Sequence, residues 1–172
     1  MPALPDLTAL AAQAEHRPVR VLMVCMGNIC RSPTAHGVLQ KKVLLAHAQQ
    51  ALEVDSAGTH DYHIGNPPDA RAQQHALRRG YDLSTQRARQ LLREDFERFD
   101  LILSMDAANE TLARRLAPAQ PRAQLMRLTE FCTRHRTSEV PDPYYGGERG
   151  FEEVLDLVED ACQGLLTALR LI

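Results

Sequence analysis

The chain has 172 residues, of which 44% are hydrophobic, and its formal net charge at pH 7 is −2. This length suits one domain with a substantial core and a single active site. The small net charge gives no reason to expect nucleic acid as a partner, so we interpret the pairs Arg78-Arg79 and Arg114-Arg115 as solvated helix faces. No stretch approaches the ~18 consecutive apolar residues of a membrane span.

Residues 1–17 precede the first apolar run and lack the basic start and apolar region of a secretory signal. We expect them to form an extension to a domain that spans residues 18–172. The extension is either a short docked helix or a disordered terminus, because its apolar residues have helical spacing but lie at a chain end. These residues are Leu4, Leu7, Leu10, Ala11 and Ala14.

The apolar run that starts at Val21 is typical of a buried strand, and it ends at Cys25. A helical pattern begins near Ser32, since Ser is a favoured N-cap and the next residue is proline. In a tight loop between a strand and a helix, main-chain N–H groups point inward and the helix N-terminus adds positive charge. The sequence therefore predicts a phosphate-binding loop formed by Met26, Gly27, Asn28, Ile29, Cys30 and Ser32.

Three side chains give this loop its chemistry. Arg31 carries a planar fork that can bind two phosphate oxygens. Helix N-termini and nearby cations favour the thiolate form of a cysteine, so Cys25 is the candidate nucleophile. The Ser32 hydroxyl could hydrogen-bond its sulfur. A free nucleophilic thiol favours a reducing compartment, and we expect the protein to be cytoplasmic.

The remaining patterns predict helices and strands in alternation. We expect a single α/β domain in which a four-stranded parallel sheet has helices on both faces and the phosphate loop follows the first strand. The expected helices are 32–49, 69–79, most of 87–99 with an irregular piece near Gln90, 109–116 and 151–169, and the later strands are 52–56, 100–105 and 124–128.

A second chemical motif is Pro141-Asp142-Pro143-Tyr144-Tyr145. The two prolines restrict the backbone on either side of Asp142, and therefore the direction of its carboxyl group. A leaving alkoxide or phenoxide needs a proton donor, which typically accelerates the reaction ~10²–10⁴-fold. Asp142 is therefore a candidate for this donor. Tyr144 and Tyr145 offer flat faces for an aromatic substrate.

The loop Cys25-Met-Gly-Asn-Ile-Cys-Arg-Ser-Pro resembles the signature of the low-molecular-weight protein tyrosine phosphatases, and the likeness extends from about Val19 to the C-terminus. The Asp55-Ser56-Ala57-Gly58-Thr59 segment and the Asp-Pro-aromatic motif also match. In the family the aspartate of the latter motif is the general acid, so the resemblance implies this role for Asp142. The resemblance implies hydrolysis of phosphotyrosine through a phosphocysteine on Cys25, without metal or cofactor. It also implies a hydrogen bond from Ser56 to Asn28 and an aromatic residue at the pocket rim, for which we choose Tyr62.

Some members of this family form a reversible disulfide between the two loop cysteines, which here would join Cys25 to Cys30. Bacterial relatives often act on tyrosine autokinases, which are therefore a possible partner. Other polar or reactive residues are interpreted as structural: His75 and Asp106 in or before helices, and Cys132 and Cys162 in the core. His60 and His63 lack further ligands at metal-site spacing.

Three alternative functions remain open. A thioredoxin-coupled arsenate reductase shares this fold and loop but needs downstream cysteines, and residues 83–107 contain none. A phosphocysteine carrier of a sugar transport system has less need for Arg31 and a general acid. A phosphotyrosine-binding module would make no chemical use of Asp142.

Overall fold

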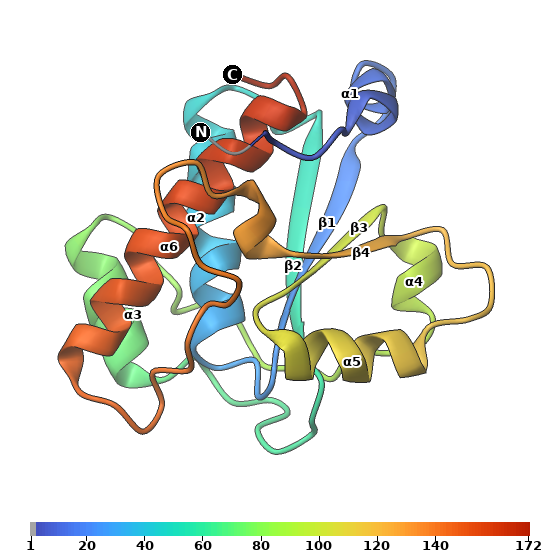
Figure 1. Cartoon of the computed structure of the whole chain (residues 1–172). Helices are drawn as coiled ribbons and strands as arrows, with labels where there is room; N and C mark the ends of the chain where they lie inside the picture. Colours follow the sequence, from blue (N-terminus) through green and yellow to red (C-terminus); the bar gives the residue numbers. More distant parts are fainter. Residues whose placement is uncertain (1–2) are drawn as a thin grey trace.

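The computed structural model describes residues 3–172 and shows one parallel sheet of four strands in the order β2-β1-β3-β4 (Figure 1). The predicted α/β domain with a four-stranded parallel sheet is confirmed. Each predicted strand is present within a few residues of its expected position. The strands are β1 (Val19–Cys25), β2 (Leu52–Gly58), β3 (Leu101–Ser104) and β4 (Gln124–Arg127).

Strand β1 lies inside the sheet and is buried on both faces, as its continuous apolar run requires. Val21 and Met23 belong to the larger hydrophobic core, whereas Leu22 and Val24 belong to the smaller core on the other face. The two-residue period of a strand therefore divides one run of sequence between two cores. In the parallel register, Cys25 lies beside Gly58 at the carboxyl end of β2.

Helices cover both faces of the sheet, as expected (Figure 1). The larger core contains the apolar sides of α2 (Arg31–Leu45) and α6 (Glu148–Ala168), and α3 (Ala70–Arg78) packs against α6. The smaller core contains residues of α4 (Asp95–Arg98) and α5 (Ala107–Leu116). A 3₁₀ turn, η1 (Leu128–Phe131), follows β4. Among the described residues, no helix has both the length and the apolar character needed to cross a bilayer.

The N-terminal extension contains a docked helix, α1 (Thr8–Ala14). Leu7 and Leu10 are buried in the larger core, and Gln13 Nε2 donates to Asp100 Oδ2 at 3.0 Å. The two alternatives for this segment were a docked helix and a disordered terminus, and the structure shows the helix. Residues 1 and 2 lie outside the described structure. Figure 1 places α1 at the end of the sheet opposite the loops that follow β1 and β2.

The prediction that residues 87–99 are mostly helical is wrong. Only Asp95–Arg98 form a helix, and Gln90 instead makes a parallel bridge with Gly58. The physical reason is tertiary pairing: the Leu91 N–H donates to Gly58 O at 2.7 Å. This main-chain donor is therefore satisfied by a distant strand and not by a helical hydrogen bond. Ala88 and Leu91 are both buried and lie three residues apart, a spacing that also fits a helix.

The helix α2 ends at Leu45, four residues before the limit expected from the sequence.

Candidate active site

The loop between β1 and α2 is shaped around Asn28, whose backbone is left-handed with φ of 58°. Non-glycine residues seldom adopt this conformation, although asparagine tolerates it better than most. The Asn28 side-chain amide donates to Ser32 Oγ at 2.7 Å and to Ser56 Oγ at 2.9 Å. The hydrogen bond implied for Ser56 is therefore present, and the loop is joined both to the start of α2 and to β2.

Cys25 lies at the inner end of a pocket of about 120 Å³. Its side chain is buried, and its Sγ lies 3.0 Å from Ser32 Oγ. The pocket lining combines loop residues with three tyrosines and Asp142: Cys25, Met26, Gly27, Ile29, Cys30, Arg31, Tyr62, His63, Asp142, Tyr144 and Tyr145. A larger hollow of about 660 Å³ between α2, β2 and residues 80–82 contains no thiol, so pocket size does not identify the site.

Arg31 is one of the largest fully buried side chains of the protein, with 2% of its surface exposed. Its Nη1 donates to Asp106 Oδ2 at 2.6 Å and to the Val140 carbonyl at 3.0 Å. Burial by itself would lower the pKa of Arg31, but the negative charges of Cys25, Asp106 and Asp142 outweigh it and raise the pKa. The guanidinium group is therefore held charged and in a fixed direction beside the pocket.

Asp142 lies across the pocket from the loop, on the segment before α6. Its Oδ2 is 3.6 Å from Arg31 Nη2, and its Oδ1 accepts the Tyr144 N–H at 3.0 Å. The carboxyl group is 38% exposed and lines the same pocket as Cys25. Cys25 and Asp142 are 117 positions apart in the sequence and yet line the same small cavity. The Asp142 side chain is more exposed to solvent than the Cys25 side chain.

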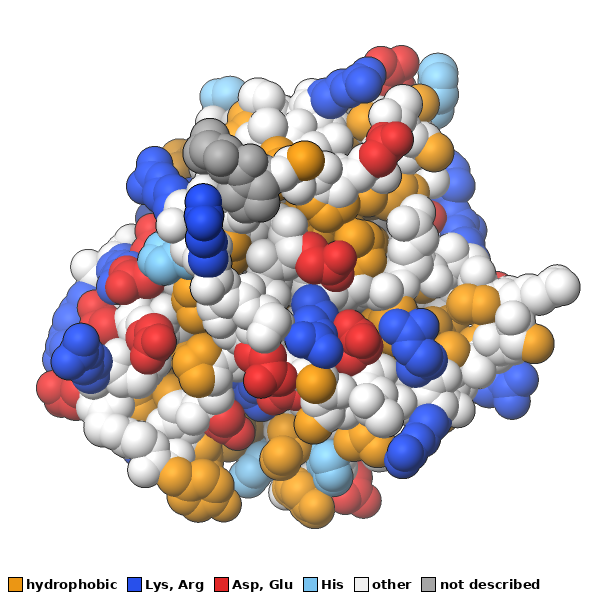
Figure 2. All heavy atoms as spheres, in the orientation of Figure 1, with side chains coloured by type: hydrophobic (Ala, Val, Ile, Leu, Met, Phe, Trp, Pro, Cys, Tyr) orange, Lys and Arg blue, Asp and Glu red, His pale blue; other side chains and the backbone are white. Residues whose placement is uncertain are grey.

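Aromatic side chains form the pocket rim from two sides. Tyr62, on the loop after β2, stacks on His60 with ring centroids 4.9 Å apart. On the opposite segment, Tyr145 packs edge-on against Tyr144 at 4.9 Å and is 94% exposed. Figure 2 shows hydrophobic and histidine side chains gathered at the lower edge of the molecule, over these two loops. The rim therefore offers aromatic surface around an interior lined by Arg31 and Asp142.

Comparison with known proteins places this chain in a family. The family model described as low molecular weight phosphotyrosine protein phosphatase matches residues 20–171. The chain belongs to this family. Its members are hydrolases, and the chain is an enzyme of the low-molecular-weight protein-tyrosine-phosphatase class. The resemblance noted from the loop motif is confirmed.

Individual relatives of the low-molecular-weight phosphatase family cover nearly the same region. A putative low molecular weight protein-tyrosine-phosphatase of Synechocystis is 44% identical over 152 residues, which are 88% of this chain and 96% of that protein. A crystal structure of an Entamoeba histolytica protein tyrosine phosphatase, with Hepes in its active site, has a TM-score of 0.85, 41% identity and 88% and 97% coverage. A structure of a Drosophila arginine phosphatase has a TM-score of 0.80, 30% identity and 86% and 95% coverage.

The candidate site includes contacts that the sequence analysis missed. Asp106 does cap α5, accepting the Asn109 N–H at 2.8 Å, but it also binds Arg31. Arg89 donates its main-chain N–H to Asn28 Oδ1 at 3.0 Å. A signal for Asp106 was available, since it follows the carboxyl end of a parallel strand, where α/β ligand sites form. No local sequence signal marks Arg89, because its contact is with Asn28, 61 positions away. Its segment was interpreted as mostly helical.

The other singled-out residues lie outside the phosphatase pocket, with the exception of Cys30 and His63, which line it. Burial is the main cause that raises the pKa of Cys30, with a further contribution from Asp69. Cys132 and Cys162 are core residues, and burial raises the pKa of each to about 12. His75 stacks on Phe151. In the described part of the chain, no cluster of three or more His, Cys, Asp or Glu side chains could hold a metal.

Proposed function

We propose that the protein hydrolyses phosphotyrosine in proteins, and small aryl phosphates, through a phosphocysteine on Cys25. The observation that supports this is the convergence of a buried thiol, a fixed guanidinium and a half-exposed carboxyl on one pocket of about 120 Å³: Cys25, Arg31 and Asp142. Aryl phosphate fits the aromatic rim, because the phosphoryl group enters the loop while the ring packs against tyrosine side chains.

In the first step, the Cys25 thiolate attacks phosphorus in line with the tyrosine oxygen. The sulfur–phosphorus bond forms as the phosphorus–oxygen bond breaks, and Asp142 gives its proton to the departing oxygen. Arg31 and the main-chain N–H groups of the loop bind the three non-bridging oxygens, whose charge they stabilise in the transition state. The positive field thus comes from the protein itself.

In the second step, water attacks the phosphocysteine. Asp142, now a carboxylate, accepts a proton from the water as the oxygen–phosphorus bond forms and the sulfur leaves as a thiolate. The Ser32 hydroxyl, 3.0 Å from the Cys25 sulfur, can donate a hydrogen bond to the leaving thiolate. Inorganic phosphate then departs, and both catalytic groups return to their starting protonation states.

The deciding experiment compares Cys25→Ser and Asp142→Ala with the native enzyme. We expect Cys25→Ser to abolish turnover of 4-nitrophenyl phosphate. Asp142→Ala should lower kcat by roughly 10²–10⁴-fold on a phosphotyrosine peptide. The loss should be smaller with 4-nitrophenyl phosphate, because its leaving group departs without full protonation. Mass spectrometry should still detect phosphorylated Cys25 in Asp142→Ala.

The matched control is Asp82→Ala, which removes an exposed acid outside this pocket. An unchanged kcat in Asp142→Ala would contradict the general-acid assignment. A native protein that binds phosphotyrosine peptide without turnover would indicate the binding module. Stable phosphocysteine that water does not discharge would indicate the carrier, and arsenate reduction coupled to thioredoxin would indicate the reductase.

Substrate choice is tested with phosphotyrosine, phosphoserine and phosphoarginine peptides. We expect preference for phosphotyrosine; phosphoarginine is included because one structural neighbour is an arginine phosphatase.

A bacterial tyrosine autokinase is the proposed protein partner, and the cytoplasm is the proposed compartment. The Cys25–Cys30 disulfide stays a prediction from the family resemblance.

A further inference from the structure

Residues 88–91 form a support behind the phosphate loop. Arg89 and Leu91 pair with the carboxyl end of β2: the Gly58 N–H donates to Arg89 O at 2.8 Å, and the Leu91 N–H donates to Gly58 O at 2.7 Å. Ala88 pairs with Gly65 and Asn66 in the loop after β2. From this position the Arg89 N–H reaches Asn28 Oδ1 at 3.0 Å. Gly58 itself contacts the loop so closely that a Cβ there would lie 2.7 Å from Met26 O. The 88–91 segment and the end of β2 thus both contact the phosphate loop directly.

Asn28 depends on this contact for its orientation. Its amide nitrogen donates to Ser32 and Ser56, which leaves its carbonyl oxygen to accept the Arg89 N–H. Since Asn28 has a left-handed backbone, the loop keeps its shape only while surrounding contacts stabilise that conformation. Loss of the Arg89 contact would release the carbonyl end of the amide.

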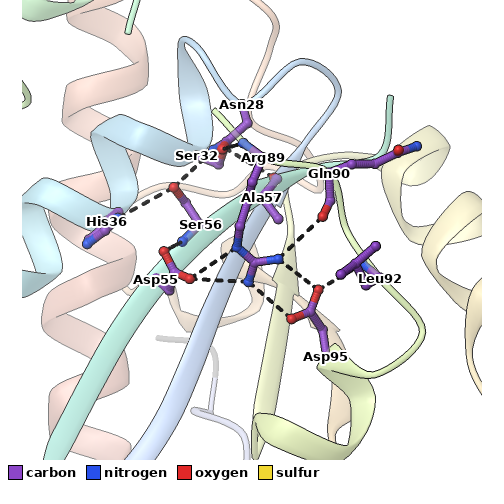
Figure 3. A network of polar contacts seen from close by, with 10 residues as sticks. All are labelled: Asn28, Ser32, His36, Asp55, Ser56, Ala57, Arg89, Gln90, Leu92 and Asp95. Carbon is purple, nitrogen blue, oxygen red and sulfur yellow. Dashed lines mark hydrogen bonds and ion pairs between the residues drawn. The ribbon is translucent and has the colours of Figure 1, made fainter. Parts of the chain in front are cut away.

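The Arg89 guanidinium bridges two elements of the fold (Figure 3). Toward α4 it forms a two-bond fork with Asp95, Nη1 to Oδ2 at 2.9 Å and Nη2 to Oδ1 at 3.1 Å. Toward β2 both Nε and Nη2 donate to Asp55 Oδ2 at 3.2 Å. The Asp95 carboxyl is 2% exposed, whereas Asp55 is 47% exposed. A buried carboxylate therefore fixes the guanidinium on one side.

The Arg89 guanidinium is held in its charged form. Burial would lower the pKa of Arg89, but its hydrogen bonds and ion pairs with Asp95 and Asp55 outweigh that effect and raise it. Asp95 also accepts the Leu92 N–H at 2.8 Å, so the same carboxylate holds the main chain just after the support segment. The cluster therefore fixes both the side chain and the backbone around Arg89.

We propose that Arg89 is a positioning residue of the phosphate site. Its ion pairs with Asp55 and Asp95 hold the 88–91 backbone so that the Arg89 N–H orients Asn28, and Asn28 keeps the loop N–H groups directed at phosphate. Arg89 does not line the pocket, so it acts through Asn28. The inference rests on the proposed function, because it concerns the same loop.

The chain offers a matched control in Arg122. Its Nε and Nη2 lie 3.1 and 3.0 Å from Oδ1 of Asp100, a carboxylate that is 4% exposed. Arg122 and Arg89 are similarly exposed, at 41% and 32%. Asp100 immediately precedes β3, at the end of the sheet opposite the phosphate loop. Arg122→Met therefore removes a comparable ion pair without touching the loop.

The experiment measures vanadate and inorganic phosphate inhibition, kcat and KM with 4-nitrophenyl phosphate, and Tm. We expect Arg89→Met to weaken inhibition by both oxyanions and to lower kcat by roughly tenfold to a hundredfold, the scale of a small misplacement of reacting groups. Arg89→Lys should recover part of the loss, because lysine restores the charge but not the fork. Arg122→Met should lower Tm while its oxyanion inhibition and kcat stay native.

Native vanadate affinity in folded Arg89→Met would overturn the inference, as would an equal loss in Arg122→Met. If Arg89→Met does not fold, Asp55→Asn decides the question, since this half-exposed side chain keeps its bond to the Ser56 N–H but loses its charge. It should weaken vanadate inhibition in the same direction, and a native value would overturn the proposal. A native enzyme without turnover or oxyanion inhibition would instead refute the proposed function.

Discussion

At the scale of single residues, the site depends on a buried cation whose partners come from distant parts of the chain. Arg31 contacts Asp106, Asp142 and the Val140 carbonyl, all more than 70 positions away in sequence. A buried guanidinium is costly unless its hydrogen bonds are satisfied, and these partners also decide its direction. The charge that we propose to bind the substrate and the stability of the fold are therefore linked at this residue.

Asp106 tests that link, because it performs two tasks. Asp106→Ala removes both the cap of α5 and a partner of Arg31, so we expect the free energy of unfolding to fall by ~1 kcal/mol for the cap alone. Loss of the charge partner should add to this and raise KM for 4-nitrophenyl phosphate. Asp106→Asn keeps a good cap but removes the charge, so it should retain most of the stability and still raise KM. Urea unfolding and steady-state kinetics measure the two effects; a native KM in both variants would contradict the role.

Residues within one local motif were predictable from sequence, and residues that act across the fold were not. Cys25, Arg31 and Ser32 lie within eight positions, and Asp142 is marked by its flanking prolines. Arg89 has no such mark, since its partners Asn28 and Asp55 lie 61 and 34 positions away. Its contribution exists only once β2 and the phosphate loop have been brought together.

At the scale of secondary-structure elements, the periodic segments were predictable, whereas residues 87–99 were predicted as mostly helical with only an irregular piece near Gln90. The helical spacing of α2 and α6 and the apolar run of β1 each reflect burial in a core, so sequence and structure agree. Residues 89–91 instead pair with Gly58, and local spacing cannot reveal a partner so far away in the sequence. The error fell on the segment that supports the candidate site.

Asp160 shows how one carboxylate joins two elements. It lies on α6 and accepts the N–H groups of Thr133, Arg134 and His135, on the segment after η1. Burial would raise its pKa, but these bonds and the His135 side chain lower it to about 2. Because the folded pKa lies below that of the unfolded chain, the carboxylate stabilises the fold at neutral pH, and this contribution is lost as pH falls toward 2.

Asp160→Asn should therefore lower the free energy of unfolding by about 2 kcal/mol at pH 7. The difference from the native protein should shrink steadily between pH 4 and pH 2, because the native carboxyl becomes protonated over that range. Denaturant unfolding across this pH range measures the effect. Asp156→Asn, on an exposed neighbour in α6, is the control and should change stability little at either pH. A constant difference for Asp160→Asn at all pH values would contradict the charge-based explanation.

At the scale of the whole molecule, the two ends of the sheet have separate tasks. The phosphate loop, its support segment and the loops that carry the aromatic rim lie at the carboxyl ends of the strands, whereas α1 packs at the other end (Figure 1). Residues 20–171 match the family model, so α1 is added outside the region that carries the chemistry. We infer that α1 contributes to stability and not to turnover.

Leu7→Ala tests this division of the molecule. Leu7 is 3% exposed within the larger core, so its truncation should lower the free energy of unfolding by ~2–5 kcal/mol. The kcat and KM for 4-nitrophenyl phosphate should remain native at temperatures where the variant is folded, because α1 lies at the end of the sheet opposite the loops that follow β1 and β2. Leu44→Ala, on a leucine that is 55% exposed, serves as the control and should cost under ~0.5 kcal/mol. A fall in kcat that exceeds the unfolded fraction of Leu7→Ala would mean that α1 communicates with the active site along the sheet.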